Sequence, residues 1–246
     1  MDRLIYTVSS GAKHILEQQA TTSHNLANAA TTGFRAQLDS FRAVPVLSEG
    51  LPTRAFVVDA TVGSDFTPGA IQQTGRELDV AVQGKGWIAV ETEDGGEAYT
   101  RHGNLRLSEN GVLQTQSGRN IVGDGGPISV PPDVTVTIAK DGTVSAIAAG
   151  TQPGATTVLG RIKLVNPPED TLVRGDDGLF RVRDGGAAEA DGGVVLVGGA
   201  LEGSNVNVVD AMVNMISLAR QFEMHMTMLK NAESNANKAS QLLALS

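Results

Sequence analysis

The chain has 246 residues, 41% of them hydrophobic, which is enough to bury the core of one large domain or two smaller ones. A formal net charge of -8 argues against binding to nucleic-acid phosphates or to an anionic membrane, and only 4% aromatic residues argue against a surface on which bases or sugars stack. The chain has no cysteine, which excludes disulfides and thiolate chemistry; it shows no cleavable signal peptide and no apolar run long enough for membrane insertion.

Glycine and proline divide the chain into three parts. All nine prolines and 27 of the 29 glycines lie between residues 45 and 203, and residues 204–246 contain neither. Because both residue types interrupt helices, this distribution predicts an N-terminal helical segment at 1–44, a central β-rich domain at 45–203 with its core at about 75–200, and a long C-terminal helix at 204–246. The middle part carries 12 basic and 21 acidic residues, net -9, so the acidity belongs to it.

The N-terminal segment is predicted to be a helix over about residues 2–32. Gly33 would end this helix at the C′ position, with Phe34 packing back on its last turn. A polar stripe runs along the helix beside the apolar one. The apolar stripe contains Leu4, Val8, Ile15, Thr22, Leu26 and Ala29, and the polar stripe contains Thr21, Asn25, Asn28 and Thr32.

The middle part alternates short apolar runs with glycine-rich turns, which is typical of antiparallel β structure. Residues 78–82 and 87–92 are predicted strands on either side of a Gly-Lys-Gly turn. Residues 134–138 and 143–147 are predicted to form a hairpin around Asp141-Gly142.

The C-terminal segment is predicted to be one helix, much longer than a typical globular helix. Asn205, Asn207 and Ser204 are candidate N-caps, and Asp210 suits the first turn. Five of the six methionines lie in this segment, and its length favours a helix that binds a partner. Its apolar stripe contains Val209, Val213, Ile216, Phe222, Met226 and Leu229, with Met212 beside it.

Neither terminal helix can bury its narrow stripe alone, so the two are expected to pair with each other. The predicted fold class is α+β: long N- and C-terminal helices paired as a coiled-coil-like unit, with a central antiparallel β-rich domain. Asparagines on the remaining faces, among them Asn25, Asn28 and Asn235, would then contact neighbouring chains, although asparagines on a solvated helix face are the ordinary alternative.

No catalytic or metal-binding pattern is found in the sequence. The four histidines, His14, His24, His102 and His225, do not have metal-ligand spacing, and the glycine clusters at 123–126 and 175–178 fit turns better than phosphate or calcium sites. We therefore expect no enzyme activity, no cofactor and no metal.

Three blocks of sequence, in this order, resemble the flagellar axial proteins, that is, the rod, hook and hook-associated subunits. They are NLANAATTGF at 25–34, LDVAVQGKGWIAVET at 78–92 with YTRHGNLRLSENGVLQTQSGRNIVG at 99–123, and LEGSNVNVVDAMVNMI at 201–216 with ARQFE at 219–223. The opening MDRLIYT and FRAQLDSFRAVPV at 34–46 are most similar to the basal-body rod proteins of the F-type, proximal family, with the G-type distal rod proteins as near relatives.

The resemblance implies a structural subunit that polymerises helically through its terminal helices into the drive shaft between the membrane ring and the hook. Its partners would be copies of itself and other proximal and distal rod subunits. It would reach the periplasm through the flagellar type III export apparatus without a cleaved signal, and Phe34 with Leu38 resembles a short export motif. The candidate assembly residues are Leu4, Val8, Ile15, Thr21, Asn25, Leu26, Asn28, Gly33, Phe34, Asn205, Val209, Met212, Val213, Ile216, Phe222, Met226, Leu229 and Asn235.

Three alternatives stay open at this point. A distal rod or hook-type subunit would share the same blocks. A binding module of a phage tail or surface fibre would combine helices and β structure but would not need all three blocks. A hydrolase of cell-wall glycan would need a pair of carboxylates in a cleft.

Overall fold

The computed structural model describes residues 2–45, 55–148 and 156–244. The chain forms two compact units. The first, here called the helical unit, contains residues 1–29, 36–65 and 206–246, and the second, here called the β unit, contains residues 30–35 and 66–205. The chain therefore passes between the two units four times.

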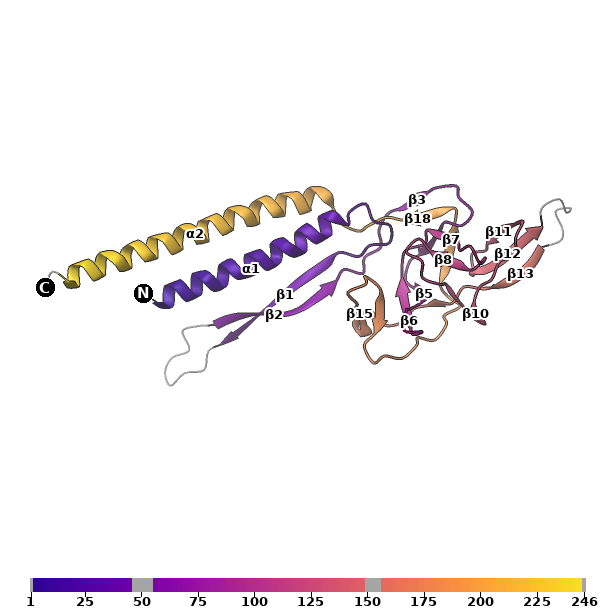
Figure 1. The fold of residues 1–246 in the computed structure, drawn as a ribbon, viewed down its shortest axis with the longest axis horizontal. Helices are drawn as coiled ribbons and strands as arrows, with labels where there is room; N and C mark the ends of the chain where they lie inside the picture. The colour runs from indigo at the N-terminus through magenta and orange to yellow at the C-terminus, as the bar shows by residue number, and fades with distance from the viewer. Residues whose placement is uncertain (1, 46–54, 149–155, 245–246) are drawn as a thin grey trace. The chain divides into compact units, whose positions relative to one another are not determined.

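The helical unit contains two helices and one β-hairpin. Helix α1 (Asp2–Ala27) and helix α2 (Val208–Ala244) lie side by side and antiparallel, and strands β1 (Gln37–Pro45) and β2 (Ala55–Ser64) pair antiparallel with a register shift after Ser40 (Figure 1). Asn207 caps α2, because its Oδ1 accepts hydrogen bonds from the backbone N–H groups of Val209 and Asp210 at 3.0 and 3.4 Å. Neither helix of the described chain combines the length and apolarity that crossing a membrane requires.

The predicted fold class is wrong in its description of the helices. The terminal helices are not a separate coiled-coil-like pair, because the β1–β2 hairpin belongs to the same compact unit. The predicted apolar stripe of α2 is also not the buried interface: Val209, Val213 and Ile216 are 67%, 60% and 56% exposed. The stripe was misassigned because α2 has apolar residues on more than one face, so periodicity alone could not select the buried one.

Helix α1 ends at Ala27, five residues before the predicted end. Gly33 does not cap it. Instead, Gly33 belongs to the β unit, has φ +66°, and lies so close to the backbone of Arg101 and His102 that a Cβ atom would come within 2.4 Å of the Arg101 carbonyl carbon. Gly33 is therefore required by a tertiary contact between residues far apart in the sequence as well as by its backbone conformation.

The β unit consists of short antiparallel strands. The central sheet has five strands in the order β14-β5-β6-β16-β15, a second sheet has the order β11-β12-β13, and the others are the pairs β17-β4, β18-β3, β7-β8 and β10-β9. The strands are β3 (Ile71–Gln73), β4 (Val80–Gln83), β5 (Trp87–Glu91), β6 (Glu97–Thr100), β7 (Leu105–Leu107), β8 (Leu113–Thr115), β9 (Val122–Gly123), β10 (Gly126–Pro127), β11 (Val134–Ile138), β12 (Thr143–Ala148), β13 (Thr156–Arg161), β14 (Leu164–Val165), β15 (Leu172–Arg174), β16 (Phe180–Val182), β17 (Val195–Gly198) and β18 (Ala200–Glu202), with a 3-10 turn at Glu169–Thr171.

Strand β5 is buried on both faces. Ile88 and Val90 belong to the larger hydrophobic cluster of the β unit, and Trp87 and Ala89 belong to the smaller one. Because side chains alternate across a strand, this arrangement requires a continuous apolar run rather than an apolar–polar alternation. The sequence Trp-Ile-Ala-Val provides that run.

The predicted hairpin around Asp141-Gly142 is confirmed, with Ile138 opposite Val144 and Val134 opposite Ala148. The two strands beside the Gly-Lys-Gly turn also form, but they are not paired with each other: β4 pairs with β17, whereas β5 pairs with β6 and β14. The predicted domain boundaries 1–44, 45–203 and 204–246 stay predictions.

Candidate assembly surface

The interface between α1 and α2 is formed by small and apolar residues. Val8, Ala12 and Ile15 of α1 are buried. The ring of His225 lies over Gly11, where a Cβ atom would be 2.6 Å from the ring, and His225 Nδ1 lies 3.2 Å from the carbonyl oxygen of Val8. The missing side chain at Gly11 thus lets the two helices approach closely at this point.

The polar side of α1 holds the β1–β2 hairpin. The amide of Asn25 makes two hydrogen bonds with the backbone of Gln37: it donates to the carbonyl oxygen at 2.9 Å and accepts from the N–H group at 2.8 Å. One turn earlier, the hydroxyl of Thr21 donates to Asp39 at 2.8 Å, and the ring of His14 meets the ring of Phe41 edge-on at 5.4 Å. The polar stripe on α1 therefore has an intramolecular role at two of its positions.

Helix α2 presents apolar side chains that the described chain does not cover. Val209, Met212, Val213 and Ile216 are at least half exposed, and so are Met224 and Met228. A groove of about 410 Å³ lies on this face, lined by Val213, Ile216, Ser217, Arg220, Gln221 and Met224. Contiguous exposed apolar side chains on a helix mark a binding surface. We call the face formed by Val209, Met212, Val213, Ile216, Met224 and Met228 the apolar face of α2.

The predicted assembly residues fall into three groups by exposure. Val8, Ile15 and Phe34 are buried, the first two in α1 and the third in the β unit. The side chain of Leu4 lies outside the part of the chain whose side chains the structure describes. Partly buried are Thr21, Asn25, Leu26, Asn28, Gly33, Asn205, Phe222 and Leu229, and exposed are Val209, Met212, Val213, Ile216, Met226 and Asn235. Leu38, of the predicted export motif, is exposed as well.

Sequence reasoning missed Ala211 and Leu218, which are buried on α2, together with His225. These three residues recur every seven positions, which is a helical spacing, but one is an alanine and another a histidine, and both contribute little to an apolar stripe. It also missed the hairpin at 37–64. The β-branched run Val57-Val58 and Thr61-Val62 was the available signal for strand β2.

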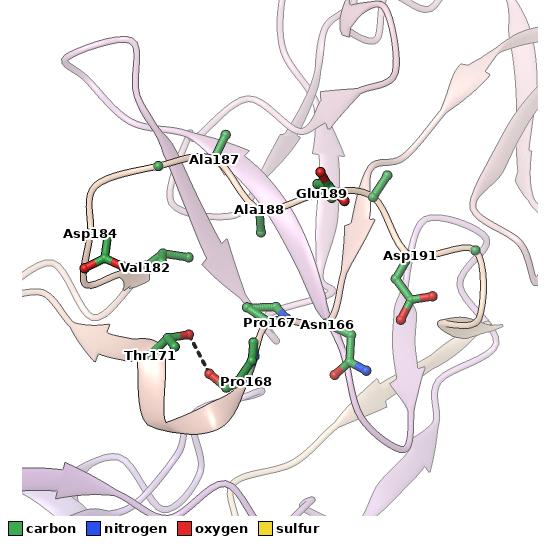
Figure 2. Close-up of a pocket in the computed structure, with 13 residues that line it drawn as sticks. Asn166, Pro167, Pro168, Thr171, Val182, Asp184, Ala187, Ala188, Glu189 and Asp191 are labelled. Carbon is green, nitrogen blue, oxygen red and sulfur yellow. Dashed lines mark hydrogen bonds between the residues drawn. The ribbon is translucent and has the colours of Figure 1, made fainter.

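The β unit has a shallow hollow of about 600 Å³ (Figure 2). Asp184 and Asp191 lie at opposite ends of it, and Thr171 donates a hydrogen bond to the carbonyl oxygen of Pro168 at 2.7 Å. Its lining contains no serine, histidine or lysine that could pair with a carboxylate as nucleophile or base. Among the described residues, no group of three or more His, Cys, Asp or Glu could hold a metal ion.

Two family models match parts of the chain. Residues 197–242, which include most of α2, match the C-terminal model described as flagellar basal body rod FlgEFG protein, and residues 81–146 match the D1 domain model of the flagellar hook protein FlgE/F/G. These matches define the class: the chain is related to the rod and hook proteins of the bacterial flagellum.

Full-length relatives narrow the class. The chain is 47% identical to the flagellar basal-body rod protein FlgF of Escherichia coli K12 and 46% identical to that of Salmonella typhimurium, with all of each chain covered. It is 32% identical to the rod protein FlgG of Bacillus subtilis over 91% of this chain and 92% of the relative. The chain belongs to the flagellar basal-body rod protein family of the F type, which confirms the resemblance seen in the sequence.

Proposed function

We propose that this chain is a structural subunit of the flagellar basal-body rod, and of its proximal part, that polymerises helically by burying the apolar face of α2 against neighbouring subunits. The observation that carries the proposal is that face itself. Val209, Val213 and Ile216 expose more than half of their side chains on a helix whose opposite side is already packed. Covering such residues removes apolar area from water, which stabilises an assembled state by about 25 cal/mol per Å².

The partners in this proposal are copies of the same chain and other proximal and distal rod subunits, and the place is the basal body in the periplasm. Family membership and the near-neutral charge of the two ends support the proposal. Residues 1–44 have a net charge of +1 (four basic, three acidic), and residues 204–246 have three of each sign. Helices with so little net charge can pack beside copies of themselves without strong repulsion.

Export through the flagellar type III apparatus without a cleaved signal is part of the proposal. Phe34 and Leu38 would form the recognised motif. In the folded chain Phe34 is buried in the β unit, whereas Leu38 belongs to β1 in the helical unit. Recognition of both side chains at once would therefore take place before residues 30–38 fold. Leu38→Ala should reduce secretion more than Leu107→Ala, which removes another exposed leucine side chain, in the β unit.

We also propose that the chain has no enzymatic role. Membership of the flagellar rod protein family supports this view, and the hollow in the β unit has no histidine or lysine in its lining that could activate the Thr171 hydroxyl as a base. Incubating the purified chain with peptidoglycan and measuring released fragments tests it: measurable release would restore the hydrolase alternative.

The assembly proposal is tested by charging the apolar face. Ile216→Asp places a carboxylate in the groove, and Asn214→Asp adds the same charge two residues away at an exposed polar position. In cells that carry only the variant chain, we expect Ile216→Asp to abolish complete rods in isolated basal bodies and to stop swimming. Asn214→Asp should assemble normally, and both purified chains should unfold like the unchanged one. Normal rods with Ile216→Asp would overturn the proposal.

A further inference from the structure

The chain passes between the two units at four places, and each of them lies within a few residues of Glu202 or of a residue that bonds to Glu202. They occur at residues 29/30, 35/36, 65/66 and 205/206. Three short segments of the β unit therefore carry all four passages: residues 30–35, 66–70 and 202–205. We call them the connecting segments. Each of them contacts Glu202 or contains it.

Glu202 is only 1% exposed, and both of its carboxylate oxygens have partners. Its Oε1 forms an ion pair with Arg35 Nη2 at 2.7 Å and accepts a hydrogen bond from the backbone N–H of Gly69 at 2.9 Å. Its Oε2 accepts a hydrogen bond from Arg101 Nη1 at 2.9 Å, and its backbone oxygen accepts from the N–H of Gly33 at 2.7 Å. One residue thus joins all three connecting segments to the loop that follows strand β6.

Further hydrogen bonds tie the same segments to one another without Glu202. Arg35 Nη1 donates to the carbonyl oxygen of Thr67 at 2.8 Å, and Asn205 Nδ2 donates to the same oxygen at 3.1 Å. The backbone N–H of Gly203 donates to Ala70 at 2.8 Å. The connecting segments are therefore held to one another in pairs as well as through the central carboxylate.

Glu202 carries the negative charge that balances the buried ion group. Two buried guanidinium groups, Arg35 and Arg101, face one carboxylate. Burial lowers the pKa of Arg101, the expected result when a cation is taken out of water. Removing the carboxylate would leave two like charges buried together with nothing to compensate them. Apolar residues could fill the same volume without this risk, so a buried ion group at this place points to a demand for a fixed arrangement rather than for stability alone.

We propose that Glu202, Arg35 and Arg101 form a clamp that makes the three connecting segments open and close as one cooperative element. If the chain is a rod subunit, as proposed above, this clamp lets a twisting load pass between the helical unit and the β unit through all four passages together. In this role Glu202 holds the three connecting segments in a fixed arrangement.

Hydrogen exchange of the full-length chain tests the clamp directly. Glu202→Gln keeps the shape of the side chain and removes its charge. The control is Glu97→Gln, which removes a carboxylate paired with Lys163 at 2.8 Å elsewhere in the β unit. We expect Glu202→Gln to raise exchange at least tenfold in residues 30–35, 66–70 and 202–205 together, with β5 still protected, and Glu97→Gln to leave these segments unchanged. Faster exchange in one segment only would overturn the clamp.

A second variant covers the case in which Glu202→Gln fails to fold. Asn205→Ala removes one tie at the edge of the clamp and leaves the ion group in place. It should raise exchange in all three connecting segments by the same, smaller factor, about threefold. Unequal changes, confined to residues next to position 205, would overturn the cooperative element.

The mechanical role is tested in cells that carry Glu202→Gln. We expect complete basal bodies that contain the variant chain, swimming in dilute medium, and loss of swimming as viscosity rises, which increases the torque on the rod. Undiminished swimming at high viscosity, or no rods at all, would overturn load transfer through the clamp. If basal bodies isolated from cells with the unchanged chain do not contain that chain, the proposed function is overturned instead, and the exchange result still stands.

Discussion

The two units solve the burial problem in opposite ways. The β unit buries both faces of strand β5, and the side chains of Ile88, Val90 and Tyr99 are completely inaccessible. The helical unit buries one side of each helix and leaves the apolar face of α2 open. This difference indicates that the β unit holds its own stability, whereas part of the stability of the helical unit depends on what covers α2.

The largest expected effect is a contrast between two isoleucines. Ile88→Ala in the β unit should lower the free energy of unfolding by about 2–5 kcal/mol, because it leaves a cavity in a closed core. Ile216→Ala on α2 should change it by less than about 0.5 kcal/mol in the monomer. Trp87, the one tryptophan, lies in the β unit, so its fluorescence follows that unit, and circular dichroism at the helical band follows α1 and α2.

The contrast would fail if Ile216→Ala destabilised the isolated chain as much as Ile88→Ala does. That outcome would mean that the apolar face of α2 is already covered in solution, for example by a second copy of the chain. Sedimentation of the unchanged protein over a range of concentrations detects such self-association directly.

A smaller effect is expected at the junction of helix and hairpin. Asn25→Leu removes both hydrogen bonds to the Gln37 backbone and should destabilise the helical unit by about 1–2 kcal/mol, with no change in the unfolding followed by Trp87. Asn28→Leu is the control, because the Asn28 amide donates to the carbonyl oxygen of His24 in the last turn of α1. Equal losses for the two variants would contradict the assigned role of Asn25.

Local chemistry explains which parts of the fold could be predicted. The hairpin at Asp141-Gly142 follows from its own turn: the backbone and hydroxyl of Thr143 both donate to the Asp141 carboxylate, at 3.1 and 2.8 Å, and Gly142 has φ +86°. The start of α2 follows in the same way from the cap at Asn207. In both cases the residues that determine the structure lie within three positions of one another.

Tertiary contacts explain what could not be predicted. Gly33 is fixed by the backbone of Arg101, and Arg35 is buried because Glu202 lies beside it; neither partner is indicated by nearby sequence. On α2, methionine and valine on the exposed side outweigh the alanines at the buried positions in any apolar pattern. The candidate assembly surface was thus recognised as a helix with excess apolar residues, but its direction required the structure.

The smallest expected effect is a dependence of the β unit on pH. His102 is the one histidine of this unit in the sequence, and burial lowers its pKa below the ordinary value of 6.5. In the unfolded chain this histidine takes up a proton near pH 6.5, whereas in the folded chain it stays neutral to a lower pH. Between these two pKa values the unfolded state binds more protons than the folded state. The free energy of unfolding is therefore highest above pH 6.5 and falls as the pH decreases below it.

Denaturant unfolding followed by Trp87 fluorescence, at intervals between pH 7.5 and 5.5, measures this dependence. The unchanged chain should lose stability over that range, and His102→Gln should show a flatter profile, because glutamine does not titrate. His24→Gln, in the helical unit, is the control and should leave the fluorescence profile unchanged. Equal slopes for His102→Gln and the unchanged chain would mean that the imidazole is not desolvated.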